Sequence, residues 1–519
     1  MTFLDKLLNY FNLSKDDYER LCIAPSFSLL PSYTNFKDIG KIVNRIKFAI
    51  ENGEKIIIYG DYDCDGIMAT SILKKTFMML GYPVDFYLPS RYKDGYGLTI
   101  ERVNKYASQN YNLIITVDNG ISQNEAIEVA NKAGIDVIIT DHHEVIKEVP
   151  NAYAIMHPLF SKYGETVSCG AYVAYMLAVA LLEKDDEYLA TLAAIATISD
   201  MMPLVSYNRD IVRLGLKFIN ENHYYALAKL AEGDFVDEEI IAMRIAPKLN
   251  AIGRIRQNEE INVLVEYLTT DNKTRINEIY AWILDVNEAR KKTMSDAFLK
   301  TPDVDLSLPA IVANTNEKEG LIGLIAARYL NSYDKVTIVF TPDSKKPNIL
   351  KGSARSKPGF SIVKAFTQLK DYLLTYGGHE CAGGCSLDIK DLPAFRDAFV
   401  SLAEEYRFVE QKKKTIPISI SDLTWENYEV YEALGPYGQG FERPYFKIDS
   451  IDPNKLTFTK NGLHIITNIT NSIKIVGFNF SYDHVHSVAN LTLVGHLGIN
   501  EFRNTKNLQF IIDEIEELA

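Results

Sequence analysis

Cysteine, tryptophan and long apolar runs are scarce in this chain of 519 residues, which contains five cysteines and two tryptophans. The cysteines are odd in number and irregularly spaced, which argues against a disulfide framework. Cys381 and Cys385 lack the second pair of ligands that a structural zinc site needs, so we expect two small buried thiols there. No apolar run reaches the roughly 20 residues that span a bilayer.

A positively charged, strongly apolar leader is also missing. The opening stretch, MTFLDKLLNYFNLSKDDYERL, predicts an amphipathic helix, so we expect the protein in the cytoplasm. Acidic residues outnumber basic ones by 68 to 55, and the net charge of −13 argues against binding of nucleic acid through an overall basic surface. The net charge does not exclude a local basic groove, and it also suits a chain that gathers carboxylates around cations.

Short, β-branched runs alternate with helical patterns in the first part of the chain. The run KIIIYGDYDCDG at 55–66 predicts a buried strand that enters a polar loop, followed by a helix over 67–80. Further apolar runs occupy 84–89, 113–120 and 136–143, and each ends in polar residues or glycine. Strands that alternate with helices predict a parallel α/β sheet, in which ligands bind beyond the carboxyl ends of the strands.

The rest of the chain changes character twice. Residues 168–300 are mainly helical and include a long helix within 260–300, which residues 301–310 link to a second α/β pattern. A charged break, QKKKT at 411–415, comes before alternating strand-like runs that predict a small β-barrel.

Acidic residues cluster after the first predicted strand, as Asp61, Asp63 and Asp65. In an extended loop alternate residues point the same way, so we expect the three carboxylates to converge, with Gly66 turning the backbone into the next helix. Carboxylates that lie so close repel one another unless a cation lies between them. Taken alone, this pattern also fits a solvated acidic turn.

Polar residues follow two more of the predicted strands. The tripeptide DNG at 118–120 comes after LIITV, DHH at 141–143 comes after DVIIT, and Asp200 ends an apolar helix. Imidazole with carboxylate suits Mn²⁺, Fe²⁺ or Zn²⁺, and carboxylate-rich sites favour Mn²⁺ and Mg²⁺. DNG alone is also a turn, and a lone aspartate at a helix end is also a cap. Together these residues predict two metal ions, about 3.5–4 Å apart, that activate a water for phosphoryl transfer.

These motifs, in this order, resemble those of the DHH phosphoesterases. Within that superfamily the chain resembles the RecJ-like exonucleases, which digest single-stranded DNA from the 5′ end, over nearly its whole length. The resemblance implies an α/β fold with a parallel-sheet DHH domain, a long connecting helix, a smaller α/β DHH-associated domain and a C-terminal OB-fold β-barrel. The matching segments are YGDYDCDG, TVDNG, TDHH, ATISD, RYKDGYGLT, SCGAYVAYML, RIAPKLNAIGR, GSARS, YGGHECAGG and LGPYGQGFERPYF.

The resemblance also divides the chain into four parts. Residues 1–205 are expected to form an N-terminal segment and the DHH catalytic domain, and residues 206–305 a helical connector. Residues 306–410 are expected to form the DHH-associated substrate-binding domain, and residues 411–519 the OB-fold domain that binds nucleic acid.

The resemblance implies roles for the residues of the metal site. His143 is expected to face the scissile phosphate as an acid or charge stabiliser, Asp61 to support the site, and a water between the metals to be the nucleophile. The metals are two divalent ions, with Mn²⁺ favoured and Mg²⁺ as the alternative. The expected ligands, of which Asp118 bridges both metals, are Asp63, Asp65, Asp118, His142 and Asp200.

Residues of the second half are expected to hold the substrate. His379 follows Gly377 and Gly378, which let the backbone approach a phosphate closely; a buried histidine at a helix start is the alternative. Arginine pairs with phosphate through two parallel hydrogen bonds, which suits an anchor for a terminal phosphate, although each arginine also fits a surface ion pair. Asn250 shares a motif with Arg254, and its role is open between ligand orientation and helix packing. The expected set is Arg91, Asn250, Arg254, Ser353, Arg355, Gly377, Gly378 and His379.

The terminal barrel suits single-strand binding, through a groove that follows the backbone and aromatic faces that stack bases. Most of the aromatic residues near its start, Tyr437, Phe441, Tyr445 and Phe446, are nevertheless expected in the core.

Two short segments depart from the RecJ-like pattern. Residues 317–318 are Glu-Lys where such chains often carry Trp-His, and residues 157–158 are His-Pro where Asn-Pro is usual. Both differences concern contacts to substrate, and neither removes an expected metal ligand.

The sequence as a whole predicts two-metal hydrolysis of single-stranded DNA from the 5′ end to 5′-mononucleotides, in DNA repair and recombination. The polarity comes from the resemblance. One alternative is a DHH phosphodiesterase for short oligoribonucleotides or cyclic dinucleotides, against which the barrel argues. Another is a non-catalytic, RecJ-derived replication scaffold, which we expect to have lost metal ligands. Expected partners are single-stranded DNA and a single-strand binding protein or a helicase; a monomer without membrane contact is expected.

Overall fold

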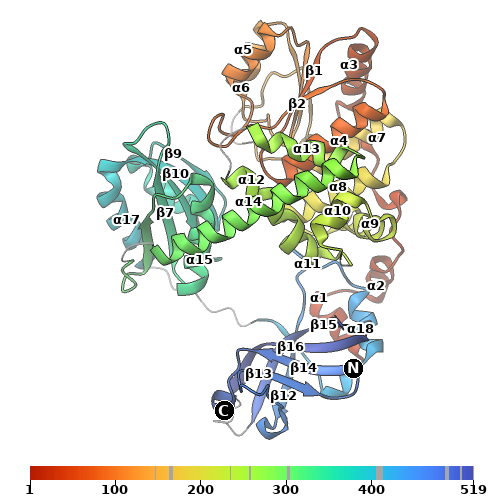
Figure 1. Cartoon of the computed structure of the whole chain (residues 1–519), viewed down its shortest axis with the longest axis vertical. Coiled ribbons are helices and arrows are strands. Elements are labelled where there is room, and N and C mark those ends of the chain that lie inside the picture. The colour runs from red at the N-terminus through yellow and green to blue at the C-terminus, as the bar shows by residue number, and fades with distance from the viewer. Residues whose placement is uncertain are drawn as a thin grey trace. The chain divides into compact units, whose positions relative to one another are not determined.

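The structure is a computed structural model, and the chain forms two compact units (Figure 1). One unit holds Phe27–Met202 and Ser206–Glu410, and the other holds Met1–Ser26, Pro203–Val205 and Gln411–Ala519. The residues that the structure describes are 1–145, 148–162, 167–233, 235–255, 259–300, 304–404, 413–485, 490–502 and 505–517.

Five parallel strands form the first sheet of the larger unit, in the order β2-β1-β3-β4-β5. Strands such as LIITV are buried along their whole length, because helices cover both faces of a parallel sheet. The parallel α/β fold expected from the sequence is therefore confirmed. The strands are β1 Ile56–Tyr59, β2 Asp85–Tyr87, β3 Leu113–Val117, β4 Asp136–Thr140 and β5 Ala154–Met156.

Helices α4, α7 and α8 contact one another beside this sheet, and almost every residue of α7 is buried. Helix α4 begins at Cys64, earlier than the predicted start at 67, because the Asp63 carboxylate caps it by accepting a hydrogen bond from the Gly66 amide at 3.1 Å. The helices of this part are α3 Ile39–Glu51, α4 Cys64–Met79, α5 Ile100–Ser108, α6 Asn124–Lys132, α7 Gly170–Leu182, α8 Glu187–Ser199 and α9 Ser206–Asn222.

The connector is helical, and its last helix, α14, is the long helix predicted within 260–300. A π-helix over Ile241–Ile245 leads directly into α12. The predicted linker at 301–310 lies partly outside the described residues. The helices are α10 Tyr225–Ala231, α11 Glu238–Ile240, α12 Ala246–Ile255, α13 Val263–Thr269 and α14 Lys273–Lys300.

A second sheet of five strands follows, in the order β6-β7-β8-β10-β9. Only its first pair is parallel, so it is a mixed sheet. Helices α15 Glu319–Tyr333, α16 Ile362–Gln368 and α17 Leu392–Glu404 belong to this domain. The strands are β6 Ala310–Asn314, β7 Val336–Pro342, β8 Ile349–Arg355, β9 Thr375–Gly378 and β10 Ala382–Asp388.

The smaller unit contains the predicted C-terminal β domain, a six-stranded sheet in the order β11-β12-β15-β16-β14-β13. The expected boundary at 410/411 and part of the charged break lie outside the described residues. Helices α1 Phe3–Phe11, α2 Lys15–Leu21, α18 Trp425–Glu432 and α19 Tyr482–Val485 accompany the sheet. The strands are β11 Thr415–Pro417, β12 Tyr445–Ile451, β13 His464–Asn468, β14 Ile473–Phe478, β15 Leu491–Phe502 and β16 Thr505–Glu517.

The N-terminal helix α1 packs on this domain, which differs from the expected division at residue 205. Phe3 and Leu7 join its core, and the ring of Phe3 stacks on Phe446 with centroids 5.7 Å apart. An amphipathic helix buries its apolar face against whichever core lies nearest in space, and sequence order does not reveal which core that is.

The predictions about thiols and aromatic rings are met with one exception. Tyr437 and Phe446 are buried in the core of the smaller unit, as expected. Cys385 is buried, but Cys381 is partly exposed, and all five cysteines are free. Within the described residues, no helix combines the length and the apolar character needed to cross a membrane.

Candidate metal centre and phosphate site

The loop after β1 places its three aspartates differently from the predicted alternation. Asp61 is the second residue after β1 and is 3% exposed, Asp63 is the N-cap of α4, and Asp65 lies in the first helical turn. A Cβ at Gly66 would lie 2.6 Å from the backbone of Asp61, so only glycine permits this tight turn. The carboxylates therefore separate into two groups instead of lining one side of an extended loop.

Asp118 directly follows β3 and has a left-handed backbone conformation, with φ of 61°. The side chain of its neighbour Asn119 donates hydrogen bonds to the carbonyls of Tyr59, Gly60 and Val117, at 3.3, 3.0 and 2.9 Å. These bonds tie the end of β1 to the end of β3 and hold the Asp118 carboxylate at the sheet edge.

Asp141, His142 and His143 directly follow the strand β4. Asp141 accepts hydrogen bonds from the amides of Ile121, His142 and His143, at 2.9, 2.7 and 3.2 Å. It also accepts one at 2.8 Å from Nδ1 of His143. Burial alone would raise the pKa of Asp141, but the hydrogen bond and charge of His143, together with the Ile121 amide and the charge of His142, outweigh burial and lower it to about 2. Asp141 is therefore an anionic support for the two histidines.

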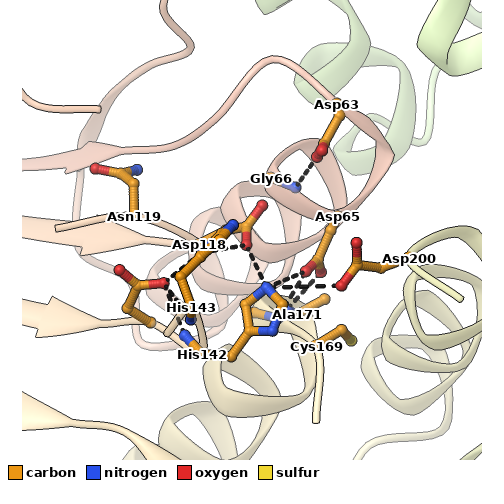
Figure 2. Close-up of polar contacts among 12 residues, drawn as sticks. Asp63, Asp65, Gly66, Asp118, Asn119, His142, His143, Cys169, Ala171 and Asp200 are labelled. Carbon is orange, nitrogen blue, oxygen red and sulfur yellow. Dashed lines mark hydrogen bonds and ion pairs between the residues drawn. The ribbon is translucent and has the colours of Figure 1, made fainter. Parts of the chain in front are cut away.

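Three carboxylates surround Nε2 of His142 (Figure 2). This nitrogen lies 3.1 Å from Oδ1 of Asp118, 3.6 Å from Oδ2 of Asp65 and 3.6 Å from Oδ2 of Asp200. Burial, followed by the charge of His143, lowers the pKa of His142 to about 3, so its ring is neutral. Among the described residues Nε2 of His142 has no hydrogen-bond partner, so a neutral ring with its proton on Nδ1 directs the Nε2 lone pair at the carboxylates.

The donor set of this cluster fits divalent cations. Four buried atoms, Asp61 Oδ1, Asp118 Oδ1, His142 Nε2 and Asp200 Oδ2, have no hydrogen-bond partner among the described residues. Burial, followed by the neighbouring carboxylates, raises the pKa of Asp61 and of Asp118 well above the ordinary value. A lone pair and several carboxylates that meet without a donor are unfavourable unless a cation neutralises them.

The ligand atoms form three groups, and the atoms of each group all lie within 4.8 Å of one another, close enough to share one ion. His142 and Asp118 each belong to two groups, so neighbouring groups share a residue. The groups are Asp118 with His142 and His143, Asp65 with His142 and Asp200, and Asp61 with Asp63 and Asp118.

The N-terminus of α7 holds Asp65 in place. Its carboxylate accepts hydrogen bonds from the amides of Gly170 and Ala171, at 2.6 and 2.7 Å. A Cβ at Gly170 would lie 2.6 Å from Cβ of Asp118 and 2.7 Å from its Oδ1. The first turn of α7 can support Asp65 only because residue 170 has no side chain.

The substitution Gly170→Ala is expected to weaken Mn²⁺ binding about 10- to 100-fold, because the new methyl group displaces Asp118. Isothermal titration calorimetry measures the change. Gly40→Ala is the matched control, since a Cβ at Gly40 meets nothing within 4 Å. Equal affinities of the two variants would contradict this role for Gly170.

Tyr96 is a site residue that sequence reasoning missed. Its hydroxyl lies 3.1 Å from Nε2 of His143, at the mouth of the carboxylate cluster. Its loop is anchored by Asp94, which accepts hydrogen bonds from the Tyr87 hydroxyl, the Ser90 amide and Nε of Arg102, each at 2.8 Å. The motif RYKDGYGLT had marked this loop, but no local pattern distinguishes a tyrosine that faces a site from one in a turn.

His157, the first residue of the His-Pro departure, is fully buried and uses both ring nitrogens. Nδ1 accepts a hydrogen bond from the Leu159 amide at 3.1 Å, so Nε2 carries the proton and donates to the His143 carbonyl at 2.9 Å. The histidine therefore caps the turn that follows and also holds the backbone of His143.

Asn250 supports the metal loop, which favours orientation over mere helix packing. Its Oδ1 accepts a hydrogen bond from the Cys64 amide at 2.8 Å. Nearby on α12, a Cβ at Gly253 would lie 2.4 Å from the Tyr62 carbonyl. Helix α12 thus fixes the loop that carries Asp61, and Asn250 acts on it through the backbone.

Three of the predicted arginines converge beside this loop. The guanidinium of Arg91 lies over the Tyr62 ring, 4.2 Å from its centroid. Burial, followed by the charge of Arg91, lowers the pKa of Arg254 to about 10, and Arg355 adds to this effect. On β8, Ser353 and Arg355 share one face, and Nη1 of Arg355 donates to Oγ of Ser353 at 3.1 Å.

The start of α15 closes over these groups. A Cβ at Gly323 would lie 2.8 Å from Nη2 of Arg355 and 3.1 Å from Oγ of Ser353. The positive end of a helix and several arginines together favour an anion.

The other expected substrate residues lie elsewhere in the second domain. His379 is exposed in the turn between β9 and β10, and its amide donates to the Ala382 carbonyl at 2.7 Å. It is neither buried nor at a helix start, so that alternative is wrong. Gly377 and Gly378 are also exposed, and a Cβ at Gly377 would meet nothing within 4 Å.

Family models match three segments of the chain. The model described as DHH family, N-terminal domain, matches residues 55–198; the DHHA1 domain matches 308–405; and the RecJ OB domain matches 415–514. A solved structure of exonuclease RecJ bound to manganese is 30% identical, with a TM-score of 0.63, and the match covers 74% of this chain and 97% of that one. The chain belongs to the RecJ family.

Other RecJ relatives extend the match to most of the chain. The single-stranded-DNA-specific exonuclease RecJ of Bacillus subtilis is 34% identical, over 92% of this chain and 63% of its own length. That of Haemophilus influenzae is 28% identical, over 92% of this chain and 91% of its own length. A structure of Thermus thermophilus RecJ in complex with Mn²⁺ has a TM-score of 0.84 at 24% identity, over 99% and 78% of the two chains, and so shares the fold.

Proposed function

We propose that this chain is a metal-dependent exonuclease that hydrolyses single-stranded DNA from its 5′ end and releases 5′-mononucleotides, in DNA repair and recombination. The observation that carries the proposal is the meeting of the unpartnered His142 Nε2 with the carboxylates of Asp65, Asp118 and Asp200. Relatives described as single-stranded-DNA-specific exonucleases support the choice of substrate.

Two divalent ions, Mn²⁺ or Mg²⁺, fit the donor set, and when bound they supply Lewis acidity that lowers the pKa of water and neutralises phosphate charge. Mn²⁺ is favoured because an imidazole joins the carboxylates. Asp118, which belongs to two of the three ligand groups, would serve both ions, and Asp61 would support the group that it forms with Asp63 and Asp118. The remaining ligands are Asp63, Asp65, His142 and Asp200.

His143 supplies the proton in this proposal. Burial would lower the pKa of His143, but the hydrogen bond to Asp141 and the negative charges of Asp141, Asp200 and Asp61 together outweigh burial and raise the pKa to about 9. Nδ1 donates to Asp141, which leaves the proton on Nε2 free for the departing 3′-oxygen. The Tyr96 hydroxyl oxygen accepts a hydrogen bond from this Nε2–H until an oxygen of the substrate takes the place of the hydroxyl.

The arginine cluster is the proposed anchor for the terminal 5′-phosphate. Arg91, Arg254 and Arg355 are buried cations that repel one another, and a phosphate dianion relieves that repulsion. A terminal phosphate held beside the metal ligands lets the enzyme start at an end and release short products. Asn250 and Ser353 orient this region, and the exposed His379 with Gly377 and Gly378 contacts the strand further along.

The deciding experiment uses single-stranded DNA labelled at either end, with Mn²⁺ or Mg²⁺. We expect the 5′ label to leave first as a mononucleotide, while the 3′ label stays on progressively shorter strands. Release of the 3′ label first would contradict the proposed digestion from the 5′ end. Cleavage of dinucleotides alone would favour the phosphodiesterase alternative, and no metal-dependent cleavage at all would favour a non-catalytic scaffold.

Metal-free protein is expected to lose stability as pH rises. Burial, followed by neighbouring carboxylates, raises the pKa of Asp65 to about 6 and of Asp200 to about 9, from 3.8. The folded chain therefore binds these protons more tightly than the unfolded chain does, and this contribution is lost as pH rises toward 9. Bound metal removes the need for the protons, so the gap in melting temperature between Mg²⁺-loaded and EDTA-treated protein widens from about pH 6 to about pH 8.5. A gap that narrows would contradict this account.

The proposal includes a cytoplasmic monomer that acts with a single-strand binding protein or a helicase. Its support is the family resemblance. Sedimentation of the protein alone, and with each partner on single-stranded DNA, tests this part.

A further inference from the structure

One tyrosine hydroxyl joins the two domains of the larger unit. Tyr92, in the loop between β2 and α5, donates a hydrogen bond to the Arg254 carbonyl at 2.5 Å. The same oxygen accepts a hydrogen bond from the Gly320 amide at 3.3 Å. Arg254 lies near the end of α12, and Gly320 lies in the first turn of α15. A loop of the DHH domain, the connector and the second domain therefore meet at one atom.

Two lysines of the second domain extend this junction. Nζ of Lys318 donates to the Ile255 carbonyl at 2.8 Å, and Nζ of Lys345 donates to the Lys93 carbonyl at 2.9 Å. Ile255 is the last described residue of α12, and its carbonyl accepts this hydrogen bond from a cation. Lys318 is the second residue of the Glu-Lys segment at 317–318, so this chain places a positive charge at the junction.

The backbones approach too closely here for a side chain. A Cβ at Gly320 would lie 2.6 Å from the Arg254 carbonyl oxygen and 2.8 Å from its Cα. Contact between two backbones leaves little freedom, so the junction fixes the distance between α12 and α15 at this point.

The junction is interleaved with the proposed phosphate anchor. Arg91 precedes Tyr92 in the chain, and Arg254 supplies both the carbonyl of the junction and a guanidinium of the anchor. Gly323, one turn after Gly320, lies against Arg355. A shift at the junction therefore moves the anchor relative to the metal ligands.

We infer that Tyr92 and Lys318 hold the anchor at the separation from the metal ligands that sets how many nucleotides leave in each cut. This inference rests on the proposed function. When a strand is held by its terminal phosphate, the phosphodiester that reaches the metal ligands depends on the distance between the two sites. A looser junction admits one more nucleotide between them.

The loop that carries Tyr92 has its own anchor. Asp94 accepts hydrogen bonds from Tyr87, Ser90 and Arg102, and none of these residues belongs to the second domain. Removal of the Tyr92 hydroxyl therefore leaves the loop folded and breaks only the contact between domains. Tyr92→Phe and Lys318→Met are the test variants. Tyr82→Phe is the matched control, because its hydroxyl also donates to a backbone carbonyl, that of Glu54, at 2.6 Å.

The experiment follows the 5′-labelled phosphate released from single-stranded DNA with Mn²⁺. Wild type and Tyr82→Phe are expected to release it as mononucleotide. For each of the two test variants the ratio of dinucleotide to mononucleotide rises about fivefold, and it rises further in the double variant, since one lost hydrogen bond shifts such a balance about fivefold. The KM for 5′-phosphorylated DNA rises with it.

The inference is overturned, and the proposed function stands, if the double variant releases only mononucleotide. This outcome counts only if the melting temperature of the double variant matches that of Tyr82→Phe. Wild type that releases no 5′ label overturns both. A single variant that fails to fold is replaced by the other, because either contact alone must move the ratio.

Discussion

Asp118→Ala is expected to lower kcat on single-stranded DNA by about 10³-fold. Asp118 lies 3.1 Å from Nε2 of His142 and belongs to two of the three ligand groups, so its loss affects both metal positions. Loss of about 4 kcal/mol of charge stabilisation in the transition state corresponds to that factor. Initial rates at saturating Mn²⁺ measure it. Asp85→Ala, an exposed aspartate on β2, is the control and keeps full activity.

Asp118→Asn separates loss of a ligand from loss of the fold. Burial raises the pKa of Asp118 well above the ordinary value, so its charge destabilises the metal-free chain. The neutral amide is therefore expected to raise the melting temperature without metal and to diminish the further rise that Mn²⁺ gives. An inactive Asp118→Asn protein that melts below wild type in EDTA would count against a metal site at this position.

Arg355→Gln is expected to raise the KM for 5′-phosphorylated DNA about 10- to 100-fold and to leave the KM for 5′-hydroxyl DNA nearly unchanged. Hydrogen bonds to a charged group contribute about 1.5–3 kcal/mol, which gives that range. The guanidinium is mostly buried, and burial lowers its pKa, so a bound phosphate is its natural counter-ion.

The comparison of the two substrates distinguishes an anchor from a general basic surface. Arg396→Gln changes an exposed arginine on α17 of the same domain and is the matched control. An equal rise of KM on both substrates would show that Arg355 attracts the strand without recognising its end. Unchanged values on both would remove it from the site.

Sequence patterns were sufficient for the parts of the fold that depend on short-range periodicity. The β-branched runs that end in Asp61, Asp118 and Asp141 are neighbouring parallel strands, so the polar residues after them meet at one sheet edge. Alternation was the wrong reason for the meeting of Asp61 and Asp63, because a helix cap competes with extended backbone for the same residues.

The contacts that shape the centre from outside the strand ends are not visible in the sequence. Gly170 lies against Asp118, and Asn250 holds the Cys64 amide, although both are far away along the chain. Such contacts depend on how α7 and α12 pack, which no local pattern encodes. The two roles of His157 follow from the hydrogen-bond partners of its two ring nitrogens, which the sequence does not reveal.

Asp118 costs stability through its left-handed backbone but supplies a proposed metal ligand, so stability and catalysis favour different residues at this position. A non-glycine residue at φ of 61° costs about 1–2 kcal/mol, and glycine would remove that cost together with the buried negative charge. A screen that ranks variants only by resistance to heat in the absence of metal would therefore enrich chains that have lost their chemistry. Directed evolution of this scaffold needs selection for turnover at every round.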